Sequence, residues 1–315
     1  MISLKPMHSL VRMTALLTAG AALSFAQNPP ATDDFLELRI ERLAGGYRYT
    51  DGPLWTPDKK LLFTELPTNT IYQWIPGQKV EPMVHNPGGP QGLTYDVQER
   101  LYICESKGRR IVRMDKKGKQ EILAEKLEGK RLNGPNDIVV RKDGNVYFTD
   151  SVFGSALAKR ELDFNGVFHI SPKGELAVIA KWKQSRPNGV ALAPNGRILY
   201  VSSSDDRKII AFDLDRNGAA SNERVFVSNV TGVPGGLRTD DKGHVFVAAG
   251  VIGIYTAGGK KIRDIELADQ PSNLAFGEAD LQTLFVTTHR SIYRIRIPHR
   301  GYVPYWSMPA PVLNP

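Results

Sequence analysis

A short pattern that recurs six times along the chain constrains the fold more than any other feature of the sequence. Each copy begins with a polar or glycine residue and continues with an alternating apolar strand, a turn rich in Asp, Gly or Asn, and a second strand. The leading residues are Asp51, Gln91, Asn136, Asn188, Gly235 and Asn273. Their spacing of 38 to 52 residues is the length of a four-stranded blade, so the six copies predict an all-β, six-bladed β-propeller.

Two further strands are expected in every copy, because Val, Ile, Tyr, Phe and Thr dominate the runs after the turn. The return strands are 61–65, 101–105, 146–150, 199–203, 245–249 and 284–288. Third strands follow them at 70–74, 110–114, 166–170, 208–212, 253–256 and 291–295. The alternative all-β architecture is a β-sandwich, which does not explain one hairpin start that recurs six times.

The repeat also sets the boundaries of the folded domain. Residues 35–300 are expected to form the propeller, and residues 301–315 a C-terminal tail. The first and last blades of a propeller must be joined, and the segment 35–40 alternates apolar and polar residues. We therefore expect 35–40 to pair into the last blade and close the ring.

The chain begins with the features of a secretory signal peptide. Residues 1–26 carry Lys5 and Arg12, then an apolar run and a small-residue end, so cleavage is expected before Gln27. The apolar run is shorter than the roughly 20 residues that a spanning helix needs, which predicts no membrane insertion after cleavage. Residues 27–34 contain Asn-Pro-Pro and are expected to be a linker. The sequence thus predicts a periplasmic or secreted protein.

Composition and charge argue against several other functions. With one cysteine, Cys104, the chain cannot form an intramolecular disulfide, and a cysteine-based zinc site is not expected. The formal net charge of +8 falls to +6 once Lys5 and Arg12 leave with the signal peptide. The densest basic stretch, 107–119, is interrupted by Asp115 and lacks a row of aromatic residues for base stacking. No nucleic-acid partner is therefore expected.

The first strand of a propeller blade lines the central channel, so the six leading residues are expected to form a ring at one mouth of that channel. Five of the six carry a side-chain oxygen, and only Asp51 is charged. Asn-Gly and Asn-Asp pairs are also ordinary turn formers, but a turn requires no particular residue at the channel-facing position of every blade. Carboxylate and amide oxygens that converge on one point suit a hard divalent cation, with Ca²⁺ as the first choice.

Four further acidic residues are expected near this mouth. Asp137 directly follows Asn136. Glu65, Glu105 and Asp150 end their return strands and are candidates to orient the ring side chains from one strand further out. The sequence contains neither a Gly-x-Ser-x-Gly nucleophile elbow nor a phosphate-binding Gly-x-x-x-x-Gly-Lys loop, so a serine hydrolase of that type and a P-loop nucleotidase are not expected.

With these residues, the chain resembles the family of gluconolactonase, senescence marker protein (regucalcin) and luciferin-regenerating enzyme. The segments that carry the resemblance are 50–55, 129–137, 147–150, 162–167, 186–189 and 271–277. It implies a six-bladed propeller that holds one divalent cation at the channel mouth and hydrolyses sugar lactones or other lactones.

The resemblance also implies roles for single residues. The metal ligands would be Asp51, Asn136 and Asn188, where Asp51 stands for a Glu of the family. The acid that usually serves as acid/base is replaced here by Gly235, so Asp51 or Asp137 would have to be the catalytic base. The candidates for substrate binding are Gln91, Arg131, Asn136 and Asn273.

Two functions follow from this reading of the sequence. The leading hypothesis is an exported, metal-dependent lactone hydrolase that takes a small-molecule lactone or sugar acid. Ca²⁺ is the expected cation, with Mg²⁺, Mn²⁺ or Zn²⁺ as alternatives. The other hypothesis is a non-catalytic propeller that binds a sugar acid or another small ligand, because Gly235 stands in place of the catalytic acid. Calcium affinity follows ligand charge, so one carboxylate predicts a weaker cation site than is usual for the family. The sequence leaves the oligomeric state open.

Overall fold

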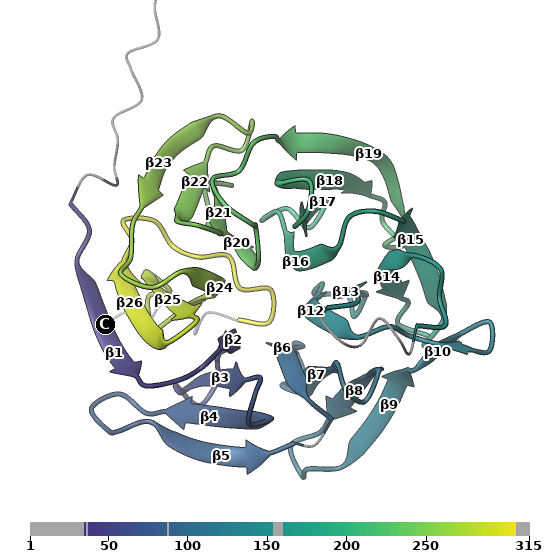
Figure 1. Ribbon diagram of the computed structural model, residues 1–315, viewed down its shortest axis with the longest axis horizontal. Coiled ribbons are helices and arrows are strands. Elements are labelled where there is room, and N and C mark those ends of the chain that lie inside the picture. The colour runs from purple at the N-terminus through teal and green to yellow at the C-terminus, as the bar shows by residue number, and fades with distance from the viewer. Residues whose placement is uncertain (1–34, 36, 87, 154–159, 307–315) are drawn as a thin grey trace, which may run out of the picture. The chain divides into compact units, whose positions relative to one another are not determined.

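The computed structural model of the protein describes residue 35 and residues 37–86, 88–153 and 160–306. Six four-stranded antiparallel sheets lie side by side around a common axis (Figure 1). The described residues form no helix, and accordingly none that is long and apolar enough to cross a membrane. This arrangement confirms the predicted six-bladed β-propeller. The expected signal peptide and linker lie outside the described residues.

Four consecutive strands build each of the first five blades, and the first strand of each lies nearest the axis (Figure 1). The first blade contains β2 (Thr50–Trp55), β3 (Leu61–Glu65), β4 (Thr70–Trp74) and β5 (Glu81–His85). The second contains β6 (Pro90–Tyr95), β7 (Leu101–Glu105), β8 (Arg110–Met114) and β9 (Gln120–Ala124). The third contains β12 (Pro135–Val140), β13 (Val146–Asp150), β14 (Asn165–Ile170) and β15 (Leu176–Trp182).

The remaining blades follow the same order. The fourth contains β16 (Pro187–Leu192), β17 (Ile198–Ser203), β18 (Lys208–Leu214) and β19 (Ala220–Val227). The fifth contains β20 (Leu237–Thr239), β21 (Val245–Ala248), β22 (Ile252–Tyr255) and β23 (Lys261–Ile265). The sixth contains β24 (Pro271–Gly277), β25 (Thr283–Thr288), β26 (Ser291–Arg296) and β1 (Ile40–Gly45). A short hairpin of β10 (Lys126–Leu127) and β11 (Lys130–Arg131) precedes the third blade.

The N-terminal strand closes the ring, but it is not the predicted segment. β1 pairs antiparallel with β26, from Ile40 opposite Ile295 to Gly45 opposite Ser291. The predicted closing strand, 35–40, therefore begins five residues too early. Alternation of apolar and polar residues does not by itself determine where pairing begins. Phe35 is instead buried against the fifth blade, with its ring edge-on to that of Phe246 at a centroid distance of 5.9 Å.

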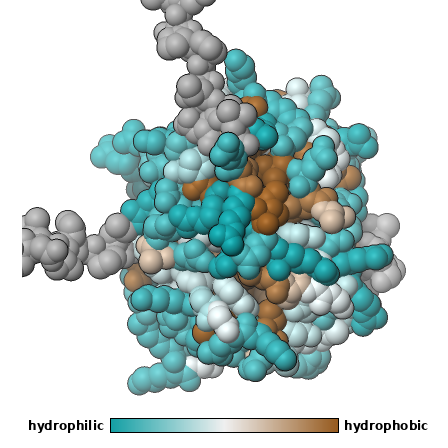
Figure 2. Space-filling model, turned by 90° about the vertical axis from the view of Figure 1, so that its left-hand side faces the viewer, coloured by the Kyte–Doolittle hydropathy of each residue, from teal (hydrophilic) through white to brown (hydrophobic). Residues whose placement is uncertain are grey.

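Apolar side chains from neighbouring blades form the core. Leu54 and Leu62 of the first blade pack with Leu93 and Ile103 of the second in one buried cluster. The outermost strands are more exposed than the inner ones, and every residue of β5 is exposed. Figure 2 views the side of the ring where β1 lies and shows a largely hydrophilic surface with a narrow band of hydrophobic side chains. The blades thus adhere through their inner strands.

The chain does not leave the propeller at residue 300, where the sequence predicted a tail. Gly301 forms a β-bridge with Asp240, and the Tyr302 N–H donates to the carbonyl of Thr239 at 2.8 Å. The Tyr305 hydroxyl donates to the Trp55 carbonyl at 2.6 Å. Trp55 and Thr239 end their channel-lining strands, so residues 301–306, here called the C-terminal plug, lie at the end of the channel opposite the ring residues.

Candidate functional site

The predicted ring residues lie on β-bulges where the channel-lining strands begin. The register between first and second strands shifts at this point in blades one, two, three, four and six. A bulge turns side chains out of the regular alternation and is common beside active sites. In each of these five blades, the residues at the channel mouth therefore lie where the regular pairing between the first and second strands is interrupted.

Neighbouring blades approach each other closely at the ring. The residue after the ring position is Gly in four blades, and a Cβ added to Gly189 would lie 2.4 Å from the Gly235 carbonyl oxygen. A hydroxyl on the second strand of one blade then donates to the ring carbonyl of the next: Thr64 to Gln91 at 3.2 Å, and Ser202 to Gly235 at 2.6 Å. The backbone of the ring is thereby fixed from blade to blade.

Asn273 does not lead the sixth blade. Pro271 pairs with Thr288 as Pro187 pairs with Ser203, so Ser272 takes the ring position and Asn273 lies one residue further along the channel. The sequence carried a signal for this register, because a Pro directly precedes the ring residue at positions 90, 135, 187 and 234. Asn273 still reaches the ring, where its amide donates to Asp51 Oδ1 at 2.9 Å.

Asp51 is buried at the channel mouth, with 6% of its surface exposed. Its Oδ1 accepts the Asn273 amide and the Gly52 N–H, the latter at 2.8 Å. Burial raises the pKa of Asp51 to about 6, although these two hydrogen bonds act in the opposite direction. Among the described residues, no group donates a hydrogen bond to Asp51 Oδ2, so this oxygen is open to a ligand.

Amide side chains supply the other open oxygens of the ring. The Asn136 amide nitrogen donates to Gln91 Oε1 at 2.6 Å, which leaves Asn136 Oδ1 without a donor among the described residues. The side chain of Asn188 makes no hydrogen bond among the described residues. Its backbone carbonyl accepts a hydrogen bond from the Thr149 hydroxyl. The structure thus brings Gln91 and Asn136 into contact and leaves Asn188 uncommitted.

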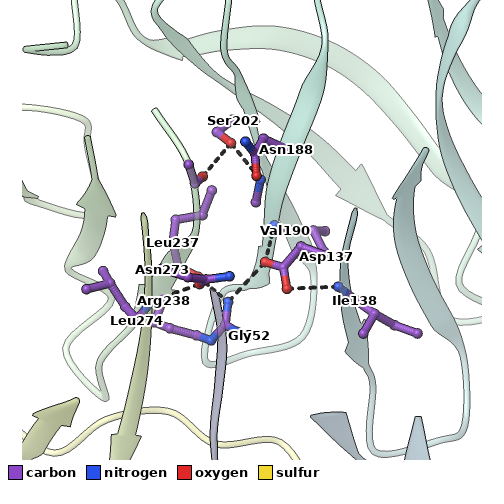
Figure 3. A network of polar contacts seen from close by, with 12 residues as sticks. Gly52, Asp137, Ile138, Asn188, Val190, Ser202, Leu237, Arg238, Asn273 and Leu274 are labelled. Atoms are coloured by element: carbon purple, nitrogen blue, oxygen red, sulfur yellow. Dashed lines mark hydrogen bonds and ion pairs between the residues drawn. The ribbon is translucent and has the colours of Figure 1, made fainter. Parts of the chain in front are cut away.

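Asp137 is fully buried and ties three blades together (Figure 3). Its carboxylate accepts the N–H groups of Ile138 at 3.0 Å and Val190 at 3.1 Å. Arg238 on β20 contributes Nη1 at 3.3 Å from Asp137 Oδ2. Arg238 was not predicted from the sequence. It is a basic residue in a channel-lining strand, at a position where the other blades carry Leu, Thr, Val or Ala, and this was a usable signal.

Two of the three acids expected to orient the ring do not contact it. Glu65 accepts hydrogen bonds from the Arg48 N–H at 3.1 Å and the Thr68 hydroxyl at 2.8 Å. Glu105 pairs with Arg110 Nε at 2.6 Å and accepts from the amide of Asn86, which lies in the connection between the first and second blades. These carboxylates stabilise loops at the mouth rather than the ring side chains.

Asp150 acts on the ring through the backbone. Its carboxylate accepts the N–H groups of Asn133 at 2.8 Å and Gly134 at 2.7 Å, in the segment that leads to Asn136. Burial raises the pKa of Asp150 to about 6, and the two backbone hydrogen bonds lower it less than burial raises it. The third acid therefore fixes the entry of the channel-lining strand β12.

Arg131, a predicted substrate-binding residue, is held away from the ring. It ends β11, and its guanidinium donates to the Gly108 carbonyl at 2.7 Å. The Arg131 N–H donates to Glu161 at 2.8 Å. The structure thus uses this side chain to join two loops of the mouth.

A cavity of about 430 Å³ lies beside the ring on the same face. It is called the mouth cavity below, and its volume is that of a small-molecule site. The lining consists of Gln91, Ser106, Lys107, Arg109, Asn133, Gly134, Ser151, Val152, Phe153 and Arg160. Gln91 belongs to both the ring and the lining, so a ligand in the cavity would lie next to the ring oxygens.

The ring offers the donor set of a hard cation. The open oxygens are one carboxylate oxygen of Asp51 and the amide oxygens of Asn136 and Asn188, and oxygen ligands of this kind suit Ca²⁺ or Mg²⁺. No cluster of three or more His, Cys, Asp or Glu side chains suited to a metal ion occurs in the part of the chain that the structure describes. The residues present therefore fit a divalent cation held mainly by neutral oxygens.

Together, the fold and this site define a six-bladed propeller with a polar binding site at one mouth of its channel. A gluconolactonase of Zymomonas mobilis is 31% identical over 313 residues, which cover 89% of this chain and 86% of that protein. A solved gluconolactonase of Xanthomonas campestris is 29% identical, with a TM-score of 0.76 over 83% of this chain and 90% of that one.

The fold has further relatives of lower identity. A regucalcin of Agrobacterium tumefaciens, described as a calcium-binding protein, has a TM-score of 0.68 at 18% identity and covers 84% of this chain and 97% of its own. Residues 49–290 match the family described as SMP-30/Gluconolactonase/LRE-like region. The chain belongs to this family, which confirms the resemblance found in the sequence.

Proposed function

We propose that the protein is a lactonase that hydrolyses the lactone of a sugar acid at the channel mouth. The observation that carries this proposal is the set of open oxygens on Asp51, Asn136 and Asn188 beside the mouth cavity. Membership of the gluconolactonase family supports the reaction class. A divalent cation bound by these three residues would supply polarisation of the lactone carbonyl.

Asp51 is the better placed of the two predicted bases. Both Asp137 oxygens accept hydrogen bonds, and its side chain is fully buried, so it has no path to a water molecule. Asp51 Oδ1 is saturated by two donors, whereas Oδ2 keeps two lone-pair sites. One site can serve a cation and the other can accept a proton from water.

The chemical step then balances around Asp51. The oxygen of a water molecule bonds to the lactone carbonyl carbon as Asp51 takes one proton. The bond from that carbon to the ring oxygen breaks, and the proton returns to the leaving oxygen. The product is the open hydroxy acid. Gln91 keeps Asn136 oriented through their 2.6 Å hydrogen bond during this sequence.

The test measures hydrolysis of glucono-1,5-lactone by purified protein before and after treatment with a chelator. We expect the chelator and Asp51→Asn each to lower kcat/KM at least 100-fold, since both remove transition-state stabilisation. Asn188→Ala is expected to raise the cation concentration needed for half-maximal activity. Asn217→Ala, in an exposed turn, is the matched control. Hydrolysis that neither the chelator nor Asn188→Ala changes would contradict the proposed cation site.

The non-catalytic alternative is favoured by Gly235. A Cβ at this position would lie 2.3 Å from the Ser272 carbonyl oxygen, so no acid can be placed there without a shift of the backbone. Gly235→Asp is therefore expected to destabilise the protein rather than restore an acid. If the wild-type protein hydrolyses no lactone but binds gluconate in calorimetry, the binding function replaces the lactonase.

We also propose that the protein is exported. The proposal rests on the signal-peptide pattern of residues 1–26. N-terminal sequencing of protein made in a host with signal peptidase should give Gln27 as the first residue. Recovery of the uncleaved chain from the cytoplasm alone would contradict it.

A further inference from the structure

The mouth cavity has a strongly one-sided charge. Its described lining includes Lys107, Arg109 and Arg160 and no carboxylate. Arg109 pairs with Glu161 outside the lining, at 3.1 Å. Neither Lys107 nor Arg160 has an ion-pair partner in the part of the chain that the structure describes. The cavity thus keeps at least two positive charges without a salt bridge among the described residues.

The cations are held in place by the protein. Arg109 Nε donates to the Leu132 carbonyl, and Arg160 Nε to the Leu162 carbonyl, both at 2.5 Å. Arg109 adopts a left-handed backbone with φ of 56°, which is uncommon for a residue that is not Gly or Asn. The Lys107 ammonium donates to Asn69 at 2.6 Å. Fixed cations of this kind require little rearrangement when an anion binds.

Two buried polar atoms of the lining residues lack partners. Arg160 Nη2 and Asn133 Oδ1 are buried and make no hydrogen bond among the described residues. Asn133 is 4% exposed as a residue. The charges of Arg109 and Arg160 lower the pKa of Asp150, but this carboxylate forms no salt bridge with either residue and accepts backbone N–H groups instead. An anionic group on a ligand could accept from Arg160 Nη2, and a hydroxyl of the same ligand could donate to Asn133 Oδ1.

We infer that the mouth cavity binds an anionic group carried by the substrate, so that acidic lactones are the preferred substrate class. This inference rests on the proposed lactonase function and names its substrate. A carboxylate and a phosphate share the required chemistry, since each accepts charge-assisted hydrogen bonds from Arg and Lys. A concave site with cations that lack a salt bridge also concentrates anions at its mouth. A neutral sugar lactone would leave these charges unused.

The first experiment compares kcat/KM for three lactones: glucono-1,5-lactone, its 6-phosphate, and a lactone of glucaric acid. We expect at least a tenfold advantage for one of the acidic substrates, and the better one identifies phosphate or carboxylate as the group bound. The advantage should shrink as salt rises from 0.05 to about 0.5 M, because salt screens partly exposed charges. Equal or higher kcat/KM for the neutral lactone would overturn the inference.

The second experiment changes the cations. Lys107→Gln and Arg160→Gln should each lower the ratio of kcat/KM for the acidic lactone to that for the neutral lactone about tenfold. Lys142→Gln, an exposed lysine on the hairpin at the opposite end of the third blade, is the matched control and should preserve the ratio. A ratio that survives both Lys107→Gln and Arg160→Gln would contradict the anion site.

Binding without turnover separates this inference from the proposed function. Calorimetry is carried out with 6-phosphogluconate, glucarate and the neutral polyol sorbitol. The protein could bind an anion, with binding weakened tenfold by Arg160→Gln, and yet hydrolyse no lactone. This result would contradict the lactonase function and support the anion site. Hydrolysis of the neutral lactone combined with no anion binding would sink the anion site alone.

Discussion

Two buried aspartates of the channel have different partners and therefore different uses. Asp137 is enclosed by backbone N–H groups and Arg238, so its charge serves the cohesion of three blades. Asp51 has one saturated oxygen and one open oxygen, so its charge is available to a ligand. Both carboxylates are buried, so the number of hydrogen-bond donors around each one, rather than its burial, distinguishes the structural role of Asp137 from the chemical role of Asp51.

The pair of Asp137 and Arg238 gives the first prediction. Arg238→Met leaves the Asp137 carboxylate buried without its cation, which is expected to lower the free energy of unfolding by about 3 kcal/mol. Urea unfolding at pH 7 measures the loss. The double variant with Asp137→Asn removes the charge as well and should recover part of it. A loss below about 1 kcal/mol for Arg238→Met would show that the pair contributes little.

Asp150 predicts a pH dependence of stability. Burial raises its pKa from 3.8 in the unfolded chain to about 6 in the folded protein. Between these values the folded state binds more protons, so the free energy of unfolding falls as pH rises from about 4 to 6.5, by up to about 3 kcal/mol.

The measurement is urea unfolding of the wild type and Asp150→Asn at pH 4, 5.5 and 7. The stability of the wild type relative to the variant should decline over this interval, because the variant has no carboxyl group to ionise. A difference between the two proteins that stays constant with pH would contradict the raised pKa.

At the scale of elements, the sequence was most informative for inner strands. The predicted return strands 61–65 and 101–105 coincide with β3 and β7, because both are wholly buried runs of apolar and β-branched residues between turns. The outer strands could not be located in the same way. β5 is exposed along its whole length, and an exposed strand shows no apolar alternation.

The same reasoning explains which site residues were found. The repeated pattern predicted that Asp51, Asn136 and Asn188 lie at the channel mouth, and the family resemblance implied their roles as metal ligands. Arg238 lies in the fifth copy of the repeat, but its role arises from a contact with a distant segment, whereas Arg160 lies outside the repeat. Arg238 meets Asp137 from 101 residues away, and a sequence pattern does not report such a contact.

Phe35 lies outside the closing strand and provides the prediction at this scale. It is 2% exposed and packs on Phe246, so Phe35→Ala should lower the free energy of unfolding by roughly 3–5 kcal/mol. Ile40→Ala, within β1 but 43% exposed, is the control and should cost less than about 1 kcal/mol. Chemical denaturation of both variants measures the difference. Equal effects would mean that β1 alone closes the ring.

The whole molecule is a ring that is joined at two places. β1 connects the N-terminal part of the described chain to the last blade, and the C-terminal plug crosses the end of the channel to contact the first and fifth blades. Residues far apart in sequence thus hold the six blades together. The loss of either connection should therefore lower the stability of the whole ring.

Truncation after Arg300 tests the C-terminal plug. It removes the β-bridge of Gly301 and the packing of Tyr305 on the cluster that contains Leu54 and Leu93, so we expect the midpoint of thermal unfolding to fall by more than 5 °C. Truncation after Trp306 retains the plug and is the control. Both proteins are compared by circular dichroism. Similar midpoints for the two truncations would show that the plug adds no stability.

The position of the plug also determines how molecules travel through the protein. Because residues 302–305 line the far end of the channel, we expect a reactant to reach the ring oxygens from the mouth. The reactant and the acid formed from it would then enter and leave through the same mouth, beside Lys107, Arg109 and Arg160. The acid would therefore compete with the reactant for the same cations, so the rate of hydrolysis would depend on how quickly the product is removed.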